Sequence, residues 1–253
     1  MGHETKHRLV VVGNGMVGHR FLEELCDRAD SREYQITVFC AEPRLAYDRV
    51  HLSSYFSHHT SEELSLVKPG FYERHGIEVR LGEAVKQIDR ATQQVHSNKG
   101  SSVGYDTLIL ATGSYPWVPP ITGAQHHECF VYRTIEDLKA IRAAAKQGKS
   151  GVVIGGGLLG LEAAGALKAL GLQTHVVEFA PVLMAEQLDR LGGEMLRRKI
   201  EAMGVQVHTS KQTQAIQMHA GKTAAHRLEF ADGSALEVDV VVFSTGIRPQ
   251  DTL

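Results

Sequence analysis

A glycine-rich segment with the pattern G-x-G-x-x-G could hold the pyrophosphate of a dinucleotide. It contains Gly155, Gly157, Leu158, Leu159 and Gly160. Glycines allow a tight turn and a close approach to phosphate, and a helix that begins there directs its free N–H groups toward the anion. Glu178 ends the next predicted strand, where a carboxylate can accept hydrogen bonds from ribose hydroxyls. The spacing predicts a nucleotide site.

A second copy of the same pattern lies near the N-terminus. It contains Gly13, Asn14, Gly15, Met16 and Gly18. Glu42 lies just past the strand predicted to follow, as Glu178 does in the other copy. The alternative is an ordinary βαβ unit with an acidic residue on its surface. The order of strand, glycines, helix and acid favours binding of an adenine nucleotide.

Each glycine motif is placed between an apolar run and a helical pattern. The apolar runs at residues 9–12 and 151–154 are typical of buried parallel strands. The helices and the strands after them are predicted at about residues 16–28, 35–39, 161–170 and 174–178. Strands that alternate with helices in this way predict an α/β fold with an internal duplication.

Small-residue turns extend the duplication. Ala111, Thr112 and Gly113 follow a predicted buried strand at residues 108–110, and Ser244, Thr245 and Gly246 follow one at residues 238–243. A nucleotide can approach closely where a strand meets such a turn. The other predicted helices lie at residues 60–66, 71–74, 136–147 and 192–203. The other predicted strands lie at residues 77–81 and 205–208, with hairpins within residues 84–103 and across Asp232–Gly233.

The segment at residues 43–56 is irregular and rich in aromatic and basic side chains. Arg49 is either a phosphate partner, since guanidinium suits phosphate oxygens, or a solvated loop residue. His58 and His59 follow, but adjacent side chains diverge and no further ligand with suitable spacing joins them. No metal site is therefore predicted.

Composition narrows the function classes. Hydrophobic content of 43%, charged content of 22% and a net charge of −2 are typical of a globular domain and offer no electrostatic attraction for nucleic acid or an acidic membrane. No apolar run approaches the roughly 18 residues of a membrane span, and no signal-peptide core is present at the start. The three cysteines are scattered, so we expect a cytoplasmic protein without disulfides.

Two nucleotide sites in one chain fit a fixed flavin and an exchangeable nicotinamide dinucleotide. The order of elements resembles flavoprotein reductases with two dinucleotide-binding domains, a class that includes rubredoxin and ferredoxin reductases. Longer strings outside the glycine motifs are similar to the N-terminal part of the large subunits of bacterial NADH-dependent nitrite reductases. These strings lie at residues 13–20, 47–59 and 178–189.

The resemblance implies roles for individual residues. FAD would be held by Gly13, Asn14, Gly15, Met16, Gly18, Glu42, Arg49, Ala111, Thr112 and Gly113. NADH would be held by Gly155, Gly157, Leu158, Leu159, Gly160, Glu178 and Gly246. Glu178 would favour NADH over NADPH, because a carboxylate repels a 2′-phosphate. Glu162 matches an acid facing the flavin–nicotinamide junction, and is the candidate catalytic residue. Its alternative role is that of an acid stabilising a helix N-terminus.

The same resemblance implies two Rossmann-like domains, the second inserted in the first. The FAD domain is expected at residues 1–118, a crossing segment at 119–145, the NADH domain at 146–245, and the start of the return to the FAD domain at 246–253. The family continues beyond this point with a flavin-contacting segment. Nitrite reductase large subunits then carry iron–sulfur and sirohaem regions.

Several positions depart from the family pattern. Ser54 stands where relatives often have a lysine, Ala41 where many have an acid, and the Cys-x-x-x-x-Cys of disulfide reductases is missing. Without that cysteine pair we expect no thiol–disulfide chemistry. Three cysteines cannot supply the four ligands of an iron–sulfur cluster, so we expect no reduction of nitrite by this chain alone. The leading hypothesis is an electron-input part that serves a haem region or a small subunit. The alternatives are a rubredoxin- or ferredoxin-type reductase and a non-catalytic nucleotide-binding chain.

Overall fold

The computed structural model describes residues 6–28, 31–56, 60–126, 129–218 and 226–253. The chain forms two compact units. Unit 1 comprises Met1–Arg49, Ser61–Ser114 and Pro249–Leu253, and unit 2 comprises Val50–Thr60 and Tyr115–Arg248. Unit 2 is thus inserted in unit 1 along the chain, as predicted. The structure groups Val50–Thr60 with unit 2, whereas the sequence placed it in the first domain; the domain limits stay predictions.

Unit 1 is built on a parallel four-stranded sheet with the order β3-β2-β1-β7. Its strands are β1 (His7–Val12), β2 (Tyr34–Cys40), β3 (Glu78–Leu81) and β7 (Thr107–Leu110). One face packs against α1 (Met16–Arg28) and α2 (Phe71–Arg74) through a core that includes Val11, Leu22 and Val38. The sheet therefore presents alternate side chains to two different layers.

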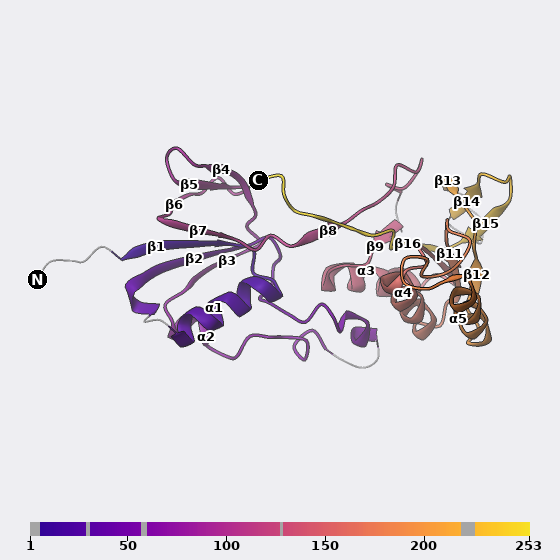
Figure 1. Cartoon of the computed structure of the whole chain (residues 1–253), viewed down its shortest axis with the longest axis horizontal. Helices are drawn as coiled ribbons and strands as arrows, with labels where there is room; N and C mark the ends of the chain where they lie inside the picture. Colours follow the sequence, from indigo (N-terminus) through magenta and orange to yellow (C-terminus); the bar gives the residue numbers. More distant parts are fainter. Residues whose placement is uncertain (1–5, 29–30, 57–59, 127–128, 219–225) are drawn as a thin grey trace, which may run out of the picture. The chain divides into compact units, whose positions relative to one another are not determined.

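The second face of this sheet is covered by an antiparallel meander. The meander consists of β4 (Val85–Asp89), β5 (Gln94–Ser97) and β6 (Ser102–Gly104). Val10 and Val12 of β1 pack there against Val85 and Val95, which are buried. Figure 1 shows unit 1 as a helical layer, a parallel sheet and this meander.

Unit 2 repeats the plan with a parallel five-stranded sheet of order β12-β11-β10-β16-β9. Its strands are β9 (Cys129–Val131), β10 (Ser150–Ile154), β11 (Gln173–Val177), β12 (Gln206–His208) and β16 (Val240–Phe243). Its helices are α3 (Ile135–Ala145), α4 (Leu158–Ala169) and α5 (Arg190–Ala202). The order of strands and helices after each glycine motif is the same in both units, which confirms the predicted duplication.

An antiparallel meander again covers one face of the sheet. It consists of β13 (Thr213–Met218), β14 (His226–Phe230) and β15 (Ala235–Val238). Val152 and Ile154 of β10 lie in one buried cluster with Leu228 and Phe230 of the meander. The remaining elements are η1 (Ser31–Glu33), η2 (Leu52–Phe56), β8 (Ser114–Pro116) and β17 (Ile247–Pro249). β8 and β17 pair in a two-stranded sheet.

Two local predictions were wrong. The predicted helix at residues 60–66 is a turn followed by a β-bridge between Tyr47 and Ser65. Its backbone groups bond across the chain, with Asp48 N–H donating to Leu64 O at 2.8 Å, so tertiary pairing replaces the helical bonds. The strand β7 is not fully buried, because it lies at an edge of its sheet and leaves Leu110 57% exposed.

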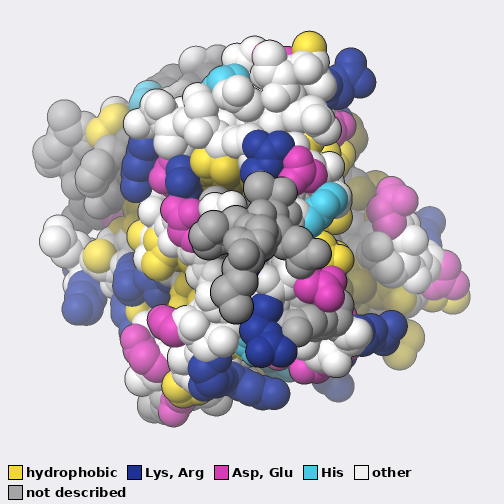
Figure 2. Space-filling view, turned by 90° about the vertical axis from the view of Figure 1, so that its left-hand side faces the viewer, with side chains coloured by type: hydrophobic (Ala, Val, Ile, Leu, Met, Phe, Trp, Pro, Cys, Tyr) yellow, Lys and Arg dark blue, Asp and Glu magenta, His cyan; other side chains and the backbone are white. Residues whose placement is uncertain are grey.

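The surface agrees with the balanced composition. On the face drawn in Figure 2, basic and acidic side chains are interspersed and do not form a patch of one sign. Among the described residues, no helix is long and apolar enough to cross a membrane. His58 and His59, for which no metal role was predicted, lie outside the described residues.

Candidate nucleotide-binding site

The second glycine motif forms the predicted turn between β10 and α4. Gly155 has a φ of +117°, which side chains other than glycine rarely adopt, and a Cβ there would collide with the carbonyl oxygen of Ser244. Its N–H donates to Val177 O at 2.8 Å. Ser244 begins the small-residue turn after β16, so the glycine turn and the T-G turn lie against each other.

Gly157 has a different reason to be glycine. It caps the N-terminus of α4, and no protein atom lies within 4 Å of the position that a Cβ would occupy. Its φ of −82° is open to any residue. The open space lies where the unpaired N–H groups of the helix start point, and a phosphate can occupy it. Neither the backbone conformation nor the packing of the fold therefore requires glycine at position 157.

Glu178 is held in place by the backbone around the glycine turn. Its Oε2 accepts from Gly156 N–H at 2.5 Å and its Oε1 from Ala180 N–H at 2.7 Å. Its own N–H donates to His208 O at 2.8 Å. Two charge-assisted bonds fix the carboxylate beside the turn and leave lone pairs on both oxygens for ribose hydroxyls.

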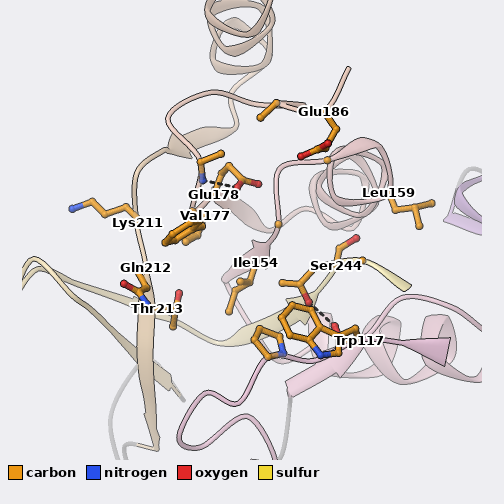
Figure 3. Close-up of a pocket in the computed structure, with 18 of the residues that line it drawn as sticks. Trp117, Ile154, Leu159, Val177, Glu178, Glu186, Lys211, Gln212, Thr213 and Ser244 are labelled. Carbon is orange, nitrogen blue, oxygen red and sulfur yellow. Dashed lines mark hydrogen bonds between the residues drawn. The ribbon is translucent and has the colours of Figure 1, made fainter. Parts of the chain in front are cut away.

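A cavity of about 780 Å³ opens beside Glu178 within unit 2. It is lined by most of the residues predicted for this site, namely Gly155, Gly157, Leu158, Leu159, Glu178 and Gly246. Leu158 and Leu159 are 62% and 38% exposed although they are large and apolar, which is typical of a surface that a ligand covers. Gly160 is buried against Gly155 and supports the turn. Figure 3 shows Glu178 among other residues that line the cavity.

Trp117 forms an apolar end of the cavity together with Pro119, Pro120 and Ile121. Its backbone is tied to the second T-G turn, because Trp117 N–H donates to Gly246 O at 2.9 Å and Thr245 Oγ1 donates to Trp117 O at 2.5 Å. From the sequence, Trp117 was expected at the end of the FAD domain and Pro119, Pro120 and Ile121 in the crossing segment, so their place in this cavity was not predicted. A lone tryptophan in a proline-rich stretch was the available signal.

Other residues of the cavity also escaped the sequence analysis. They include Phe179, Met184, Glu186, Lys211 and Thr213. Met184 follows the glycine turn closely, since its N–H donates to Gly156 O at 3.0 Å. Phe179, Met184 and Glu186 belong to the string at residues 178–189 that supports the resemblance, but the sequence assigned them no role in the site. Only the folded chain brings them together with Lys211 and Thr213.

Glu162 lies on α4 one helical turn beyond Leu158 and is half-buried. It is not among the residues that line the cavity. Burial raises the pKa of its carboxyl, and the nearby His51 opposes this by lowering it. Burial and the charge of Glu162 raise the pKa of Tyr132. The helix α4 packs against η2, the segment that follows His51, so Glu162 lies near two ionisable groups of unit 2, His51 and Tyr132.

The first glycine motif has the same geometry in unit 1. Gly13 has a φ of +108°, and a Cβ there would collide with the carbonyl oxygen of Ala111. No protein atom lies within 4 Å of a Cβ built on Gly15, while Gly18 packs against the backbone of Gly13. Thr112 Oγ1 donates to Gln250 O at 2.8 Å. The open position at Gly15 suits a phosphate group, as the position at Gly157 does.

Asn14 turns its side chain into the protein. It is 5% exposed, and its Oδ1 accepts from the Tyr72 hydroxyl at 2.9 Å. His19 Nδ1 lies 3.1 Å from the same hydroxyl. Asn14 could therefore contact a cofactor only through its backbone. Met16 is the first residue of α1 and is half-buried.

Glu42 and Arg49 form an ion pair, although the sequence analysis gave them separate ligand groups. An Arg49 Nη2 hydrogen bonds to Glu42 Oε1, and the Tyr47 hydroxyl donates to Glu42 Oε2 at 2.7 Å. The Arg49 guanidinium also lies 4.9 Å from the centre of the Tyr47 ring. A phosphate that binds Arg49 must therefore compete with the Glu42 carboxylate.

The family model for pyridine nucleotide-disulphide oxidoreductases matches residues 7–253. The chain belongs to this family. Relatives within the family include the large subunit of nitrite reductase (NADH) from Escherichia coli strain K12, which is 65% identical over 249 residues. The match covers 98% of this chain and 29% of that relative. The resemblance found in the sequence is thereby confirmed.

Two further comparisons support the oxidoreductase fold. The assimilatory nitrate reductase electron transfer subunit of Bacillus subtilis strain 168 is 38% identical, with 96% of this chain and 31% of the relative covered. The crystal structure of the ferredoxin reductase for the CYP199A2 system from Rhodopseudomonas palustris superposes with a TM-score of 0.87 at 25% identity. That match covers 97% of this chain and 60% of the other chain. The chain thus spans about a third of the length of its curated nitrite and nitrate reductase relatives.

Proposed function

We propose that this chain is the electron-input part of a larger assimilatory nitrite reductase. It binds NADH in unit 2 and FAD in unit 1, and it passes a hydride from the first to the second. The electrons then serve the reduction of nitrite to ammonia. The 65% identity to a nitrite reductase (NADH) large subunit supports this proposal, and the chain spans 29% of that relative.

One observation carries the NADH part: a cavity of about 780 Å³ opens beside a fixed carboxylate at the second glycine turn. The backbone N–H groups at the start of α4 bind the pyrophosphate where Gly157 leaves open space. Glu178 accepts hydrogen bonds from the adenosine ribose and disfavours a 2′-phosphate.

The residues of unit 1 fit FAD, because Gly15 leaves the same open space as Gly157. Gly13, Gly15 and Gly18 would hold the pyrophosphate, together with Ala111, Thr112 and Gly113. Glu42 would bind the ribose, and Arg49 would exchange part of its bond to Glu42 for a phosphate oxygen. When bound, FAD accepts a hydride and can pass on single electrons. The chain binds and orients the two cofactors, and Glu162 is the candidate for positioning the nicotinamide end.

The domain limits and partners belong to the same proposal. Residues 1–118 and 246–253 contribute to the FAD domain, residues 119–145 form the crossing and residues 146–245 form the NADH domain. Sirohaem and an iron–sulfur cluster are supplied by the rest of the larger protein, by its haem region or by a small subunit. A cytoplasmic location follows from that assignment.

A second candidate is an NADH-dependent reductase of a small electron carrier. The rubredoxin–NAD(+) reductase of Alcanivorax borkumensis is 32% identical over 253 residues, with 98% of this chain and 64% of the relative covered. This identity of 32% is lower than the 65% to the nitrite reductase large subunit, which favours the nitrite reductase assignment. Electron delivery to rubredoxin by the longer protein, with no reduction of nitrite, would favour the carrier.

A spectroscopic titration tests the central step. The purified chain is mixed with FAD, freed of excess cofactor, and titrated with NADH without oxygen. We expect the bound flavin absorbance to bleach with about one equivalent of NADH. A chain that binds NADH but retains no FAD would instead support the remaining alternative, a nucleotide-binding chain without catalytic activity.

A further inference from the structure

Three charged residues line the described cavity of unit 2. Glu178 and Glu186 are acidic, and Lys211 is the one cation among the described lining residues. A cation beside an adenosine ribose is the group that a 2′-phosphate needs. The position and the bonds of Lys211 therefore bear on the choice between the two nicotinamide dinucleotides.

Lys211 starts beside Glu178 but points away from it. Its backbone N–H donates to the Glu178 carbonyl oxygen at 3.0 Å, so the two residues are neighbours. Figure 3 shows the amino group of Lys211 on the side away from the Glu178 carboxylate. A lysine has a flexible four-carbon stem, so a change of rotamer can swing its amino group toward the ribose side of the cavity.

The turn between β14 and β15 holds this amino group. Lys211 Nζ donates to Asp232 Oδ2 at 2.5 Å and to Ser234 Oγ at 2.7 Å. It also lies 5.5 Å from the centre of the Phe230 ring. The lysine side chain is only 24% exposed. Two acceptors and an aromatic face thus satisfy the cation outside the cavity.

Asp232 uses its two oxygens for different purposes. Oδ1 accepts from Ser234 N–H at 3.0 Å and from Ser234 Oγ at 2.6 Å, which shapes the turn. Oδ2 accepts from Lys211. The turn and the hold on the lysine can therefore be separated by a substitution that alters only the second oxygen.

We propose that Asp232 and Ser234 withhold Lys211 from the bound nucleotide and so strengthen the selection of NADH against NADPH. The ligand class excluded is an adenosine ribose with a 2′-phosphate. Glu178 repels that phosphate, and the Asp232 hold removes the cation that would offset the repulsion. The inference rests on the proposed function, since it takes this cavity as the NADH site.

The substitution Asp232→Asn tests the inference. The asparagine retains an acceptor for the Ser234 bonds, but its amide group cannot accept from Lys211. NADH and NADPH binding to the chain can be followed by the fluorescence of Trp117, the only tryptophan, which lines the cavity. We expect the NADPH dissociation constant to fall about fivefold, as one new charge-assisted contact would cause, and that of NADH to change less than twofold.

A double variant provides the control. In Lys211→Met with Asp232→Asn the cation is gone, and the gain in NADPH affinity should disappear. An unchanged NADPH affinity in Asp232→Asn would overturn the inference, and so would a gain in NADPH affinity that survives in the double variant. In both cases normal NADH binding would still uphold the proposed function. Failure of the unaltered chain to bind NADH would overturn both. The far-ultraviolet circular dichroism and thermal midpoint of each variant establish that it is folded.

Discussion

His175 and His208 stack on neighbouring strands of unit 2, with His175 Nδ1 3.1 Å from His208 Nε2 and ring centroids 5.4 Å apart. One ring must donate its N–H to the other, so the pair is suited to two neutral imidazoles. Burial, and then His208, lower the pKa of His175 to about 4. Burial, followed by Lys211 and Arg197, lowers the pKa of His208.

The pair predicts a loss of stability in mild acid. Unfolded histidine has a pKa near 6.5, so the unfolded chain binds more protons than the folded chain between pH 6.5 and about 4. Stability from this source is present above pH 6.5 and falls as the pH drops, by up to about 3 kcal/mol for His175. Urea unfolding of the chain between pH 7 and 4.5 measures it.

The matched variant is His175→Gln, which keeps a polar side chain but does not titrate in this range. Its free energy of unfolding should fall less steeply with acid than that of the unaltered chain. Parallel pH profiles for the two proteins would contradict the assignment of the acid sensitivity to this pair.

Glu178 should determine the preference for NADH. Glu178→Gln removes the negative charge and places an amide group against either Gly156 N–H or Ala180 N–H, which now donate to the carboxylate. We expect the ratio of NADPH to NADH dissociation constants to fall about tenfold, equivalent to about 1.4 kcal/mol. Trp117 fluorescence titrations with both nucleotides measure the ratio.

Glu186→Gln is the control, because Glu186 lines the same cavity and is exposed. It should change the ratio less than Glu178→Gln does. An unchanged ratio in Glu178→Gln would remove Glu178 from the ribose site.

Two alanine substitutions, one at the N-cap of α4 and one within the helix, separate ligand binding from folding. Gly157→Ala places a methyl group in the open space at the helix start, where no protein atom lies within 4 Å. The fold should tolerate it, but a phosphate could no longer approach the helix N–H groups closely. We expect NADH binding to weaken at least tenfold, with the thermal midpoint maintained, as followed by titration and by circular dichroism.

The control is Gly165→Ala, which also adds a methyl group to open space on α4. It should leave NADH affinity unchanged. It should also raise the free energy of unfolding by about 0.5–1 kcal/mol, because alanine has a higher helix propensity than glycine. Equal NADH affinity in the two variants would mean that Gly157 does not border the phosphate.

The buried bond between Tyr72 and Asn14 should support the first glycine turn. Tyr72→Phe removes the hydroxyl that donates to Asn14 Oδ1, and it leaves a polar atom buried without its partner. We expect a loss of about 1–3 kcal/mol in the free energy of unfolding of unit 1. Urea unfolding measures it, with the exposed Tyr115→Phe as the control; equal stability of the two variants would show that the bond is unimportant.

Much of the architecture was predictable because it rests on local patterns. The apolar runs at residues 9–12 and 151–154 could only be buried strands once a glycine turn and a helix followed each of them. The positive φ of Gly13 and Gly155 is likewise a property that glycine alone supplies at no cost. The fold class, the duplication and the two turns therefore follow from residue type and spacing.

Tertiary structure decided which side chains reach the site. Asn14 belongs to the first motif, yet its side chain points inward to Tyr72, which is far away in the sequence. The capped pattern at residues 60–66 is a turn because its backbone bonds to residues near Tyr47. Neither outcome is encoded in neighbouring residues.

The clearest division between the two kinds of information lies at the cavity. The sequence by itself determined that a strand, a glycine turn and a helix come before the strand that ends near Glu178, and this fixed order predicted one nucleotide site for Gly157 and Glu178. Only the folded chain placed Trp117 beside them and turned Lys211 toward Asp232. These contacts join segments that are remote in the chain, and packing and charge pairing select them only after the sheets have formed.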